Sequence, residues 1–359
     1  MFIAEFLKDI VVSAVSMLNS ASPWMIFSFF IAGIVHAFIN AESMRKAALG
    51  TTSVKGILLT TLSGMCIPIC SCGTIPLGIS MYYSGAYLGP TLAFMTSTPM
   101  INPIAIVLAY GLLGKEIATV YVITGFVAPM IIGTIANRFG ADELYYKHAY
   151  ENQGKKIELK VRKPSFKKRF QGGMRWSFQE LAFSISKYTV SGMLVAGLLF
   201  TVIPQEWIQR YLGEPGMVSL LGITVVAALM YVCAVGHIPF IAALVASGAA
   251  PGVAITFLMA GCATNIAELI SIDRMIGKRA MLMYSVMVIA ISEVAGYVTN
   301  IIFPDFKPVL DYDAVNHSIS NANNLIVAFP DWLQYVCTAV LVIYACISLV
   351  KWGRKKLCK

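Results

Sequence analysis

The sequence predicts an all-α polytopic membrane protein made of two inverted-topology repeats, in each of which spanning helices flank a broken or re-entrant helical hairpin. The first observation behind this prediction is composition. Of the 359 residues, 58% are apolar and 13% are charged, whereas a soluble domain has about 25% charged residues. The second is that uncharged segments extend from Gly56 to Gly114 and from Pro215 to Ala267. A helix crosses a bilayer with about 20 apolar residues, so both segments are long enough to lie in a membrane.

The third observation is an internal repeat with a constant offset of 163 residues and no gap. The matched positions include a cysteine, a proline, glycines and an asparagine. They are Cys70, Gly73, Pro76, Gly85, Gly89 and Asn102 in the first copy and Cys233, Gly236, Pro239, Gly248, Gly252 and Asn265 in the second. Apolar composition alone does not place these residue types in one register, so we infer two structural repeats.

The first half of the chain divides at charged residues and helix breakers. Residues 1–21 are expected to form an amphipathic or short membrane helix, because charged side chains near its start oppose a full crossing. Repeat 1 covers 22–136. Its first span should begin where Pro23 occupies the first helical turn, and a span at 117–136 should end it.

Glycine and proline interrupt the middle of repeat 1. Segments 73–84 and 87–98 each contain about 12 residues and cover roughly 18 Å as helices, about half a membrane. A re-entrant hairpin that turns near Gly85 therefore fits better than two short, kinked crossings, although both stay open. A bilayer tolerates such broken backbone only where protein buries it or where it lines a cavity.

The second half repeats this plan after a polar connection. Residues 137–186 form a basic linker, and repeat 2 covers 187–303 with its own hairpin near Gly248. Residues 304–331 form a polar loop rich in Asp and Asn. The remainder, 332–359, is a C-terminal transmembrane helix followed by a basic tail.

Basic residues set the predicted orientation, because cytoplasmic loops carry an excess of Lys and Arg. Arg45 and Lys46 mark the cytoplasmic side, whereas their counterpart around 205–210 is poor in positive charge. Lys115 stands alone, whereas its counterpart at 274–279 is strongly basic. Corresponding points therefore lie on opposite faces, as in many secondary transporters. The linker and tail fall inside and 304–331 outside, so topology rather than nucleic-acid binding explains the net charge of +9.

The cysteines are the first candidates for chemistry. Cys66, Cys70 and Cys72 crowd the broken backbone of repeat 1, and thiolates favour soft metals and metalloids. Their spacing is not that of a structural zinc site. The repeat adds three positions to the candidate substrate-binding set: Cys233, the counterpart of Cys70, and Cys262, which takes the place of Pro99. The alternative is that these cysteines pack as small hydrophobic residues.

A second candidate feature is a pair of helix starts. Asn102 precedes a proline and is a favoured N-cap, and Asn265 holds the same place in repeat 2. Two half-helix N-termini near the membrane midplane would present free N–H groups and partial positive charge to a substrate. The alternative is an ordinary capped break in each helix.

Ionisable residues inside membrane segments are functional candidates by default. Glu268, Glu293 and His237 are therefore candidates for ion coupling. Glu268 is close enough in sequence to Asp273 and Arg274 to reach the membrane interface instead, and His237 could simply pack between helices. His237 would join Cys70 and Cys72 as a metal ligand only if the substrate were a metal ion.

The motif around these residues resembles a known family. It reads Cys70-Ser-Cys72-Gly-Thr-Ile-Pro76-Leu, followed by Gly85-Ala, Gly89, Ala93-Phe94 and Thr98-Pro99-Met-Ile-Asn102-Pro103. This is similar to the predicted permease family that includes the ArsP organoarsenical efflux permeases. The resemblance covers most of the chain. It implies an inner-membrane permease that expels thiophilic toxic species, notably trivalent organoarsenicals such as methylarsenite.

We therefore expect a secondary transporter that is not an enzyme, has no catalytic residue and needs no cofactor. Its partners would be a small thiophilic substrate or metal ion and the lipid bilayer, without nucleic acid; a homodimer stays open. One alternative is a copper, zinc or small-anion permease of the same fold. Another is a membrane thiol–disulfide electron carrier, which would use Cys70 and Cys233 beside Pro76 and Pro239.

Overall fold

The computed structural model describes residues 2–39, 41–67, 69, 71–149, 166–202, 216–230, 233–246, 248–304, 306 and 329–357. Within these ranges the chain is helical, apart from short turns and one isolated bridge between Tyr87 and Tyr145. Four helices there are long and apolar enough to cross a membrane, and two bent helix pairs raise the number to as many as six. These features confirm the predicted all-α polytopic membrane class.

The helices of the two halves correspond one to one. Helices α3 (Val54–Cys66), α4 (Ser71–Tyr83), α5 (Leu88–Met100), α6 (Pro103–Leu112) and α7 (Gly114–Phe139) match α12 (Met217–Met230), α13 (Ala234–Ala246), α14 (Pro251–Ala263), α15 (Ile266–Met275) and α16 (Lys278–Ile302). The first residue of α4 corresponds to Ala234 and its last residue to Ala246, which is the offset of 163 residues. The α5–α6 pair bends by 43° and the α14–α15 pair by 42°.

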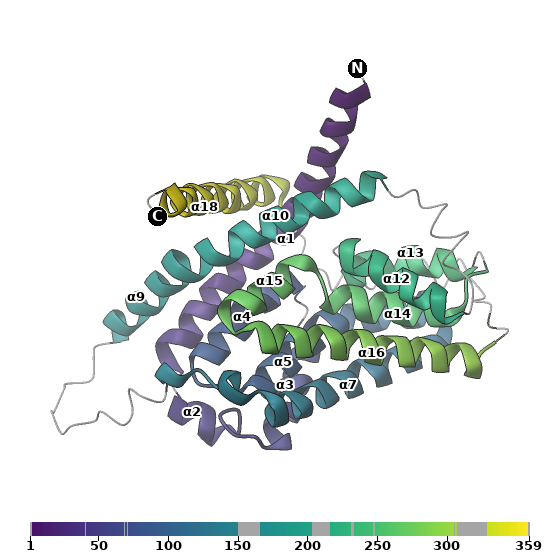
Figure 1. Cartoon of the computed structure of the whole chain (residues 1–359), viewed down its shortest axis with the longest axis horizontal. Coiled ribbons are helices and arrows are strands. Elements are labelled where there is room, and N and C mark those ends of the chain that lie inside the picture. The colour runs from purple at the N-terminus through teal and green to yellow at the C-terminus, as the bar shows by residue number, and fades with distance from the viewer. Residues whose placement is uncertain are drawn as a thin grey trace.

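Equivalent helices of the two halves run in opposite directions. Helices α7 and α16 lie side by side along the long axis of the molecule (Figure 1). Glu143, just after α7 ends, accepts the N–H groups of Arg279 (3.2 Å) and Ala280 (2.6 Å) where α16 begins. Gly114, where α7 begins, lies beside Phe306, which follows the end of α16. This arrangement is what inverted repeats require, while their orientation in a membrane stays a prediction.

The chain reverses between α4 and α5 at Gly85, and between α13 and α14 at Gly248. Both glycines have positive φ, 104° and 106°, which side chains disfavour. Beyond the first reversal, the Tyr87 N–H donates to the Leu49 carbonyl (2.8 Å), near α2 (Ala41–Lys46). The reversal at Gly85 therefore lies at one end of the molecule, with other connecting segments. This differs from the re-entrant tip that we predicted there.

The turn in the interior is instead the cysteine segment between α3 and α4. A Cβ added to Gly64, near the end of α3, would lie 2.7 Å from Thr98 Oγ1. Thr98 lies two residues before the end of α5, next to the bend between α5 and α6. The first residue of α4 and the start of α6 are thus placed on the same level as the bend of the other repeat.

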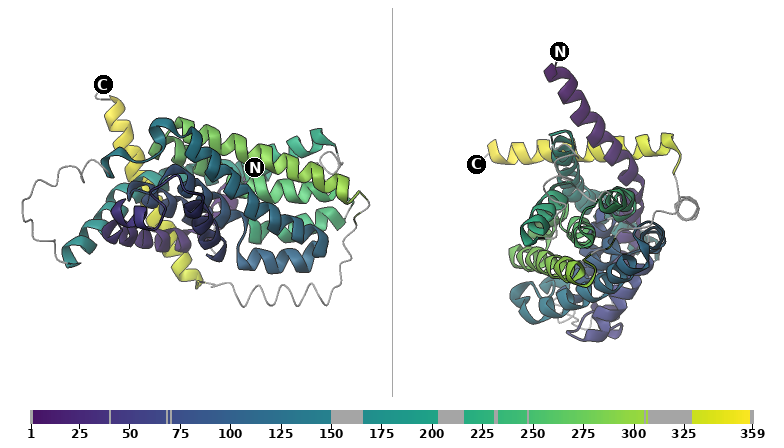
Figure 2. Two further views of the ribbon diagram at one scale, coloured as in Figure 1. Left: turned by 90° about the horizontal axis from the view of Figure 1, so that it is seen from below. Right: turned by 90° about the vertical axis from the view of Figure 1, so that its right-hand side faces the viewer.

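The N-terminal part of the chain forms one helix, α1 (Phe2–Phe38), where we predicted two. Pro23 has no N–H to bond the Asn19 carbonyl, but the Ser22 hydroxyl lies 3.5 Å from that oxygen. The same hydroxyl is 2.9 Å from Thr338 Oγ1 on α18 (Asp331–Leu357). Ser and Thr side chains and neighbouring helices can satisfy a backbone that proline interrupts. The N-terminal half of α1 projects from the body of the molecule (Figures 1 and 2).

The described part of the basic linker is helical and leads straight into repeat 2. Helix α9 (Phe166–Trp176), a π-helical turn (Ser177–Leu181) and α10 (Ala182–Val202) follow one another without a break. Trp176 stacks on His36 of α1, with ring centroids 3.9 Å apart. His36 thus has the packing role expected for it. Helix α18 packs on α1 and α10 and crosses the direction of α16 steeply (Figure 2).

Candidate functional site

Each bent helix pair resumes at an asparagine cap. The Asn102 side-chain oxygen accepts the Ala105 N–H at 2.9 Å, and the Asn265 side-chain oxygen accepts the Glu268 N–H, also at 2.9 Å. Both asparagines have extended backbone and are buried. The predicted helix starts are confirmed. Whether the remaining N–H groups of these helix ends meet a substrate stays a prediction.

The two repeats meet at the second of these caps. The Asn265 amide nitrogen donates to the Ser71 hydroxyl at 3.1 Å. Ser71 is the first residue of α4 and lies between Cys70 and Cys72 in the sequence. Both partners are at least 96% buried, with exposed fractions of 0% and 4%. A helix start of repeat 2 is therefore held against the cysteine segment of repeat 1.

Glu268 completes this contact. One carboxyl oxygen accepts from the Asn265 amide at 3.1 Å, and the other accepts from the Tyr284 hydroxyl on α16, also at 3.1 Å. Glu268 is fully buried, so the alternative that it reaches the membrane interface is wrong. Asp273 and Arg274 pair with each other further along α15 (3.4 Å).

Sequence reasoning missed the tyrosines of this site. Tyr284 and Tyr121 occupy equivalent places in α16 and α7, and both are fully buried. Tyr121 donates to the carbonyl oxygen of Met100, the last residue of α5. Repeat 1 has Ala105 where repeat 2 has Glu268. The signal that could have found this pair was the offset of 163 residues, which matches one tyrosine to the other.

The repeat also explains two asparagines to which we gave no role. Asn137 on α7 accepts the Gly89 N–H (2.9 Å), and Asn300 on α16 accepts the Gly252 N–H (2.6 Å). Each bond ties the first turn of a bent helix pair to the long helix that follows it in the chain. The cores of the two repeats are thus held together by the same polar contact.

The structure brings only part of the predicted thiol set together. Cys72 is buried in α4, and Cys66 is exposed at the end of α3. Cys262 is buried in α14, hydrogen-bonds the backbone of Ala234 and lies within electrostatic range of Cys233 and Glu268. Pro99 is buried inside α5. Cys70 lies outside the described residues.

The remaining candidates lie elsewhere in repeat 2. The His237 ring nitrogen Nδ1 is 3.0 Å from the Cys233 carbonyl oxygen. One oxygen of Glu293 accepts from Thr224 on α12 at 2.5 Å, and its other oxygen has no hydrogen-bond partner. Within the described ranges, no group of three or more His, Cys, Asp or Glu side chains could hold a metal ion. Cys70, one of the predicted metal ligands, falls outside those ranges.

Comparison with known sequences identifies the family. A family model described as "Predicted permease" matches residues 7–301 of the chain. The chain belongs to this predicted permease family. It is accordingly a multi-pass membrane permease, in keeping with its apolar spans and bent helix pairs.

Three relatives of the permease resemble it along most of their length. The UPF0718 protein MJ0584 of Methanocaldococcus jannaschii is 24% identical over 334 residues, which cover 77% of this chain and 91% of the relative. The UPF0718 protein YcgR of Bacillus subtilis is 25% identical over 263 residues, with 71% and 85% covered. The UPF0718 protein YraQ of Escherichia coli is 21% identical over 251 residues, with 69% and 68% covered. No solved structure matches the permease.

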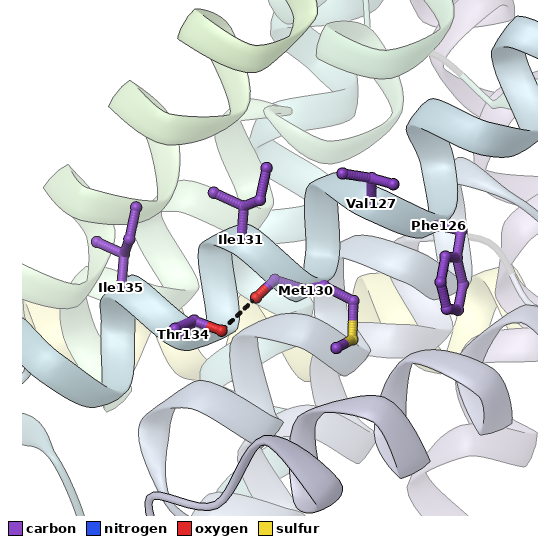
Figure 3. A pocket seen from close by; sticks show the side chains of 6 residues that line it. All are labelled: Phe126, Val127, Met130, Ile131, Thr134 and Ile135. Carbon is purple, nitrogen blue, oxygen red and sulfur yellow. Dashed lines mark hydrogen bonds between the residues drawn. The ribbon is translucent and has the colours of Figure 1, made fainter.

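The permease also has a shallow apolar depression, which is not part of this site. It lies along one face of α7 (Figure 3) and is lined by Phe126, Val127, Met130, Ile131, Thr134 and Ile135. The one hydroxyl there, on Thr134, bonds the Met130 carbonyl of its own helix (2.7 Å). Val127 and Ile131 are exposed, as expected for a surface that faces lipid. The depression offers no thiol or charged group to a substrate.

Proposed function

We propose that this permease is a secondary exporter of thiophilic toxic species, with trivalent organoarsenicals such as methylarsenite as its first substrate class. The observation that carries the proposal is the hydrogen bond between Asn265 and Ser71. It places a half-helix N-terminus of one repeat against the cysteine segment of the other, inside the protein. Soft thiol ligands and a broken helix then meet at one point, which is the arrangement that transporters use for substrate sites.

The thiols would act as reversible ligands. A transported species must bind firmly enough to enter the site and weakly enough to leave it. We therefore assign one or two thiol contacts at a time, from Cys70 and Cys72 first, with Cys66, Cys233 and Cys262 as further positions. A closed cage of three thiolates would retain the substrate. Rocking of one repeat against the other would move the site from cytoplasmic to external access.

The geometry gives less support to the alternatives. An anion would meet the Glu268 carboxyl at the start of α15, where like charges repel if that group is ionised. A metal ion would need at least three ligands, and the described residues offer no such group. We further assign the protein to the cell inner membrane, with the linker and the C-terminal tail in the cytoplasm.

A toxicity panel tests the substrate class. We expect expression in an arsenic-sensitive host to raise resistance to methylarsenite more than to inorganic arsenite, copper or zinc. Cys72→Ser should remove this resistance without loss of protein in the membrane, because the buried thiol in α4 is replaced by a hydroxyl that binds trivalent arsenic weakly.

The matched control is Cys346→Ser on α18, which changes an exposed thiol outside both hairpins. We expect it to keep full resistance. Resistance to copper or zinc alone would favour the metal alternative. Full methylarsenite resistance of Cys72→Ser combined with Cys70→Ser would overturn the thiol contact.

A further inference from the structure

The two repeats are chemically unequal at the point where they meet. The cysteine cluster Cys66, Cys70 and Cys72 belongs to repeat 1, whereas both carboxyls buried in apolar helices, Glu268 and Glu293, belong to repeat 2. Their equivalents in repeat 1 are Ala105 and Met130. A buried carboxyl is costly to ionise in a membrane and marks proton or ion pathways. One repeat thus carries the thiols and the other the ionisable groups.

A chain of hydrogen bonds joins these two chemistries. From the cysteine segment it runs from the Ser71 hydroxyl to the Asn265 amide (3.1 Å), and from that amide to the Glu268 carboxyl (3.1 Å). The other carboxyl oxygen ends the chain at Tyr284 (3.1 Å). The equivalent Tyr121 has no carboxyl to meet and donates to the Met100 carbonyl instead. The repeat symmetry is therefore kept in the tyrosines and broken at the carboxyl.

We propose that Glu268 is the proton-coupling group of this permease and that the Asn265 amide transmits its protonation state to the cysteine segment. This inference rests on the proposed export function and adds its energy source, an exchange of one outgoing substrate for an incoming proton. The proton enters from outside, adds to the Glu268 carboxylate and is released to the cytoplasm. Asn265 and Tyr284 are positioning residues, because they act through the carboxyl.

Protonation changes what the carboxyl can do for its neighbours. The carboxylate accepts on both oxygens, and hydrogen bonds to a charged group are stronger than those to a neutral one. Once one oxygen carries a proton, it becomes a donor and both contacts weaken. The Asn265 amide is then no longer held in place beside Ser71. Loading the cysteine segment and protonating Glu268 are in this way alternatives for one mobile contact.

The surroundings of Glu268 are defined on every packed side. Tyr284 faces it from α16, Cys262 lies in range from α14, and Cys72 is buried near the start of α4. Helix α10 contributes Gly192, which packs against Ala267. Its Lys187 lies over the ring of Tyr188, and the tyrosines at the far end of α4, Tyr82 and Tyr83, bond the carbonyls of Glu143 and Met275.

Glu293 does not have the same connection. Its partner in the described part of the chain is Thr224, in the same repeat. It lies nine residues beyond Tyr284 on α16, which corresponds to roughly 13 Å along a helix. A proton on Glu293 has no hydrogen-bonded route to Ser71, so the coupling role is assigned to Glu268.

Transport by the purified full-length protein in liposomes tests this assignment, with methylarsenite as the probe and arsenic content as the readout. Two modes are compared: accumulation driven by an acidic lumen, and exchange at equal pH on both sides. We expect wild type to perform both. Glu268→Gln keeps the size of the side chain but cannot release a proton, so it should lose acid-driven accumulation and keep exchange. Glu116→Gln, an exposed carboxyl at the start of α7, should keep both modes.

The paired tyrosines supply a second readout. Tyr284→Phe removes a donor to the carboxylate and should raise the pH at which exchange is half-maximal. Tyr121→Phe, in the equivalent place of repeat 1, should leave that pH unchanged. Acid-driven accumulation by Glu268→Gln, loss of it in Glu293→Gln alone, or equal pH shifts for both tyrosines would overturn the inference. Exchange by wild type without any effect of the gradient would overturn the coupling but not the export function, whereas wild type inactive in both modes would overturn both.

Discussion

At the scale of single residues, the paired asparagines separate a site at the helix starts from a site made of cysteines alone. Loss of an N-cap costs about 1 kcal/mol, which a protein with several spans survives. A cap that also directs free N–H groups at a substrate should affect transport more than folding. We expect Asn102→Ala and Asn265→Ala to abolish export while the protein stays inserted and monodisperse in detergent.

Two further substitutions sharpen this test. Asn102→Ser can still cap and should keep partial export. Asn265→Ser should keep less, because it also loses the amide that donates to Ser71 and Glu268. Asn265→Asp should fail, since it puts a second carboxyl beside the first. Normal transport by both alanine variants would leave the asparagines as ordinary caps and would place the substrate elsewhere.

The caps were predictable because an N-cap is read from a few neighbouring residues. The partners of Glu268 were not, because Tyr284 lies sixteen residues further on in another helix and Ser71 lies 194 residues away, in the other repeat. A carboxyl in an apolar run is visible in a sequence, whereas the groups that surround it depend on how the helices pack.

At the scale of the elements, the chain reversals at Gly85 and Gly248 carry a prediction about stability. Both have positive φ near 105° (104° and 106°), and backbone in such regions costs about 1 to 3 kcal/mol for residues other than glycine. Gly85→Ala and Gly248→Ala should therefore each lower the apparent Tm in detergent. A similar loss at both positions is expected, because the two reversals have the same geometry.

Gly172→Ala is the matched control for these variants. Gly172 lies in α9, and an added Cβ there meets nothing within 4 Å. Alanine is favoured over glycine inside a helix by about 0.5 to 1 kcal/mol, so this variant should be neutral or slightly more stable. An unchanged Tm for both reversal variants would mean that the loops relax into another turn.

The elements also show where sequence patterns end. The bounds of α4, α5 and α6 follow from local glycine, proline and asparagine signals. The continuity of α1 does not, because Ser22 finds its partner Thr338 316 residues away on α18. The position of the Gly85 reversal at one end of the molecule was likewise not visible, since helix length alone cannot say which turn of a broken stretch lies in the interior.

At the scale of the whole molecule, the predicted membrane orientation has a direct test. Single cysteines introduced on a cysteine-depleted background should react with a membrane-impermeant reagent according to side. A probe at Ser165, in the linker, should be labelled only from the cytoplasm, and a probe at Asn321 only from outside. Both positions lie outside the described residues. External labelling at Ser165 would contradict the inverted-topology prediction, whatever the antiparallel course of α7 and α16.

The unequal division of thiols and carboxyls has a consequence for how such a gene can change. The antiparallel halves share the bounds of their helices, so either half could have been copied from the other. Once Ala105 and Glu268 came to differ, a tandem of two first halves would hold thiols without the buried carboxyl. A tandem of two second halves would lack the cysteine cluster. The ancestral ability to replace one half by the other has therefore been lost, and the two halves can now be inherited only as an unlike pair.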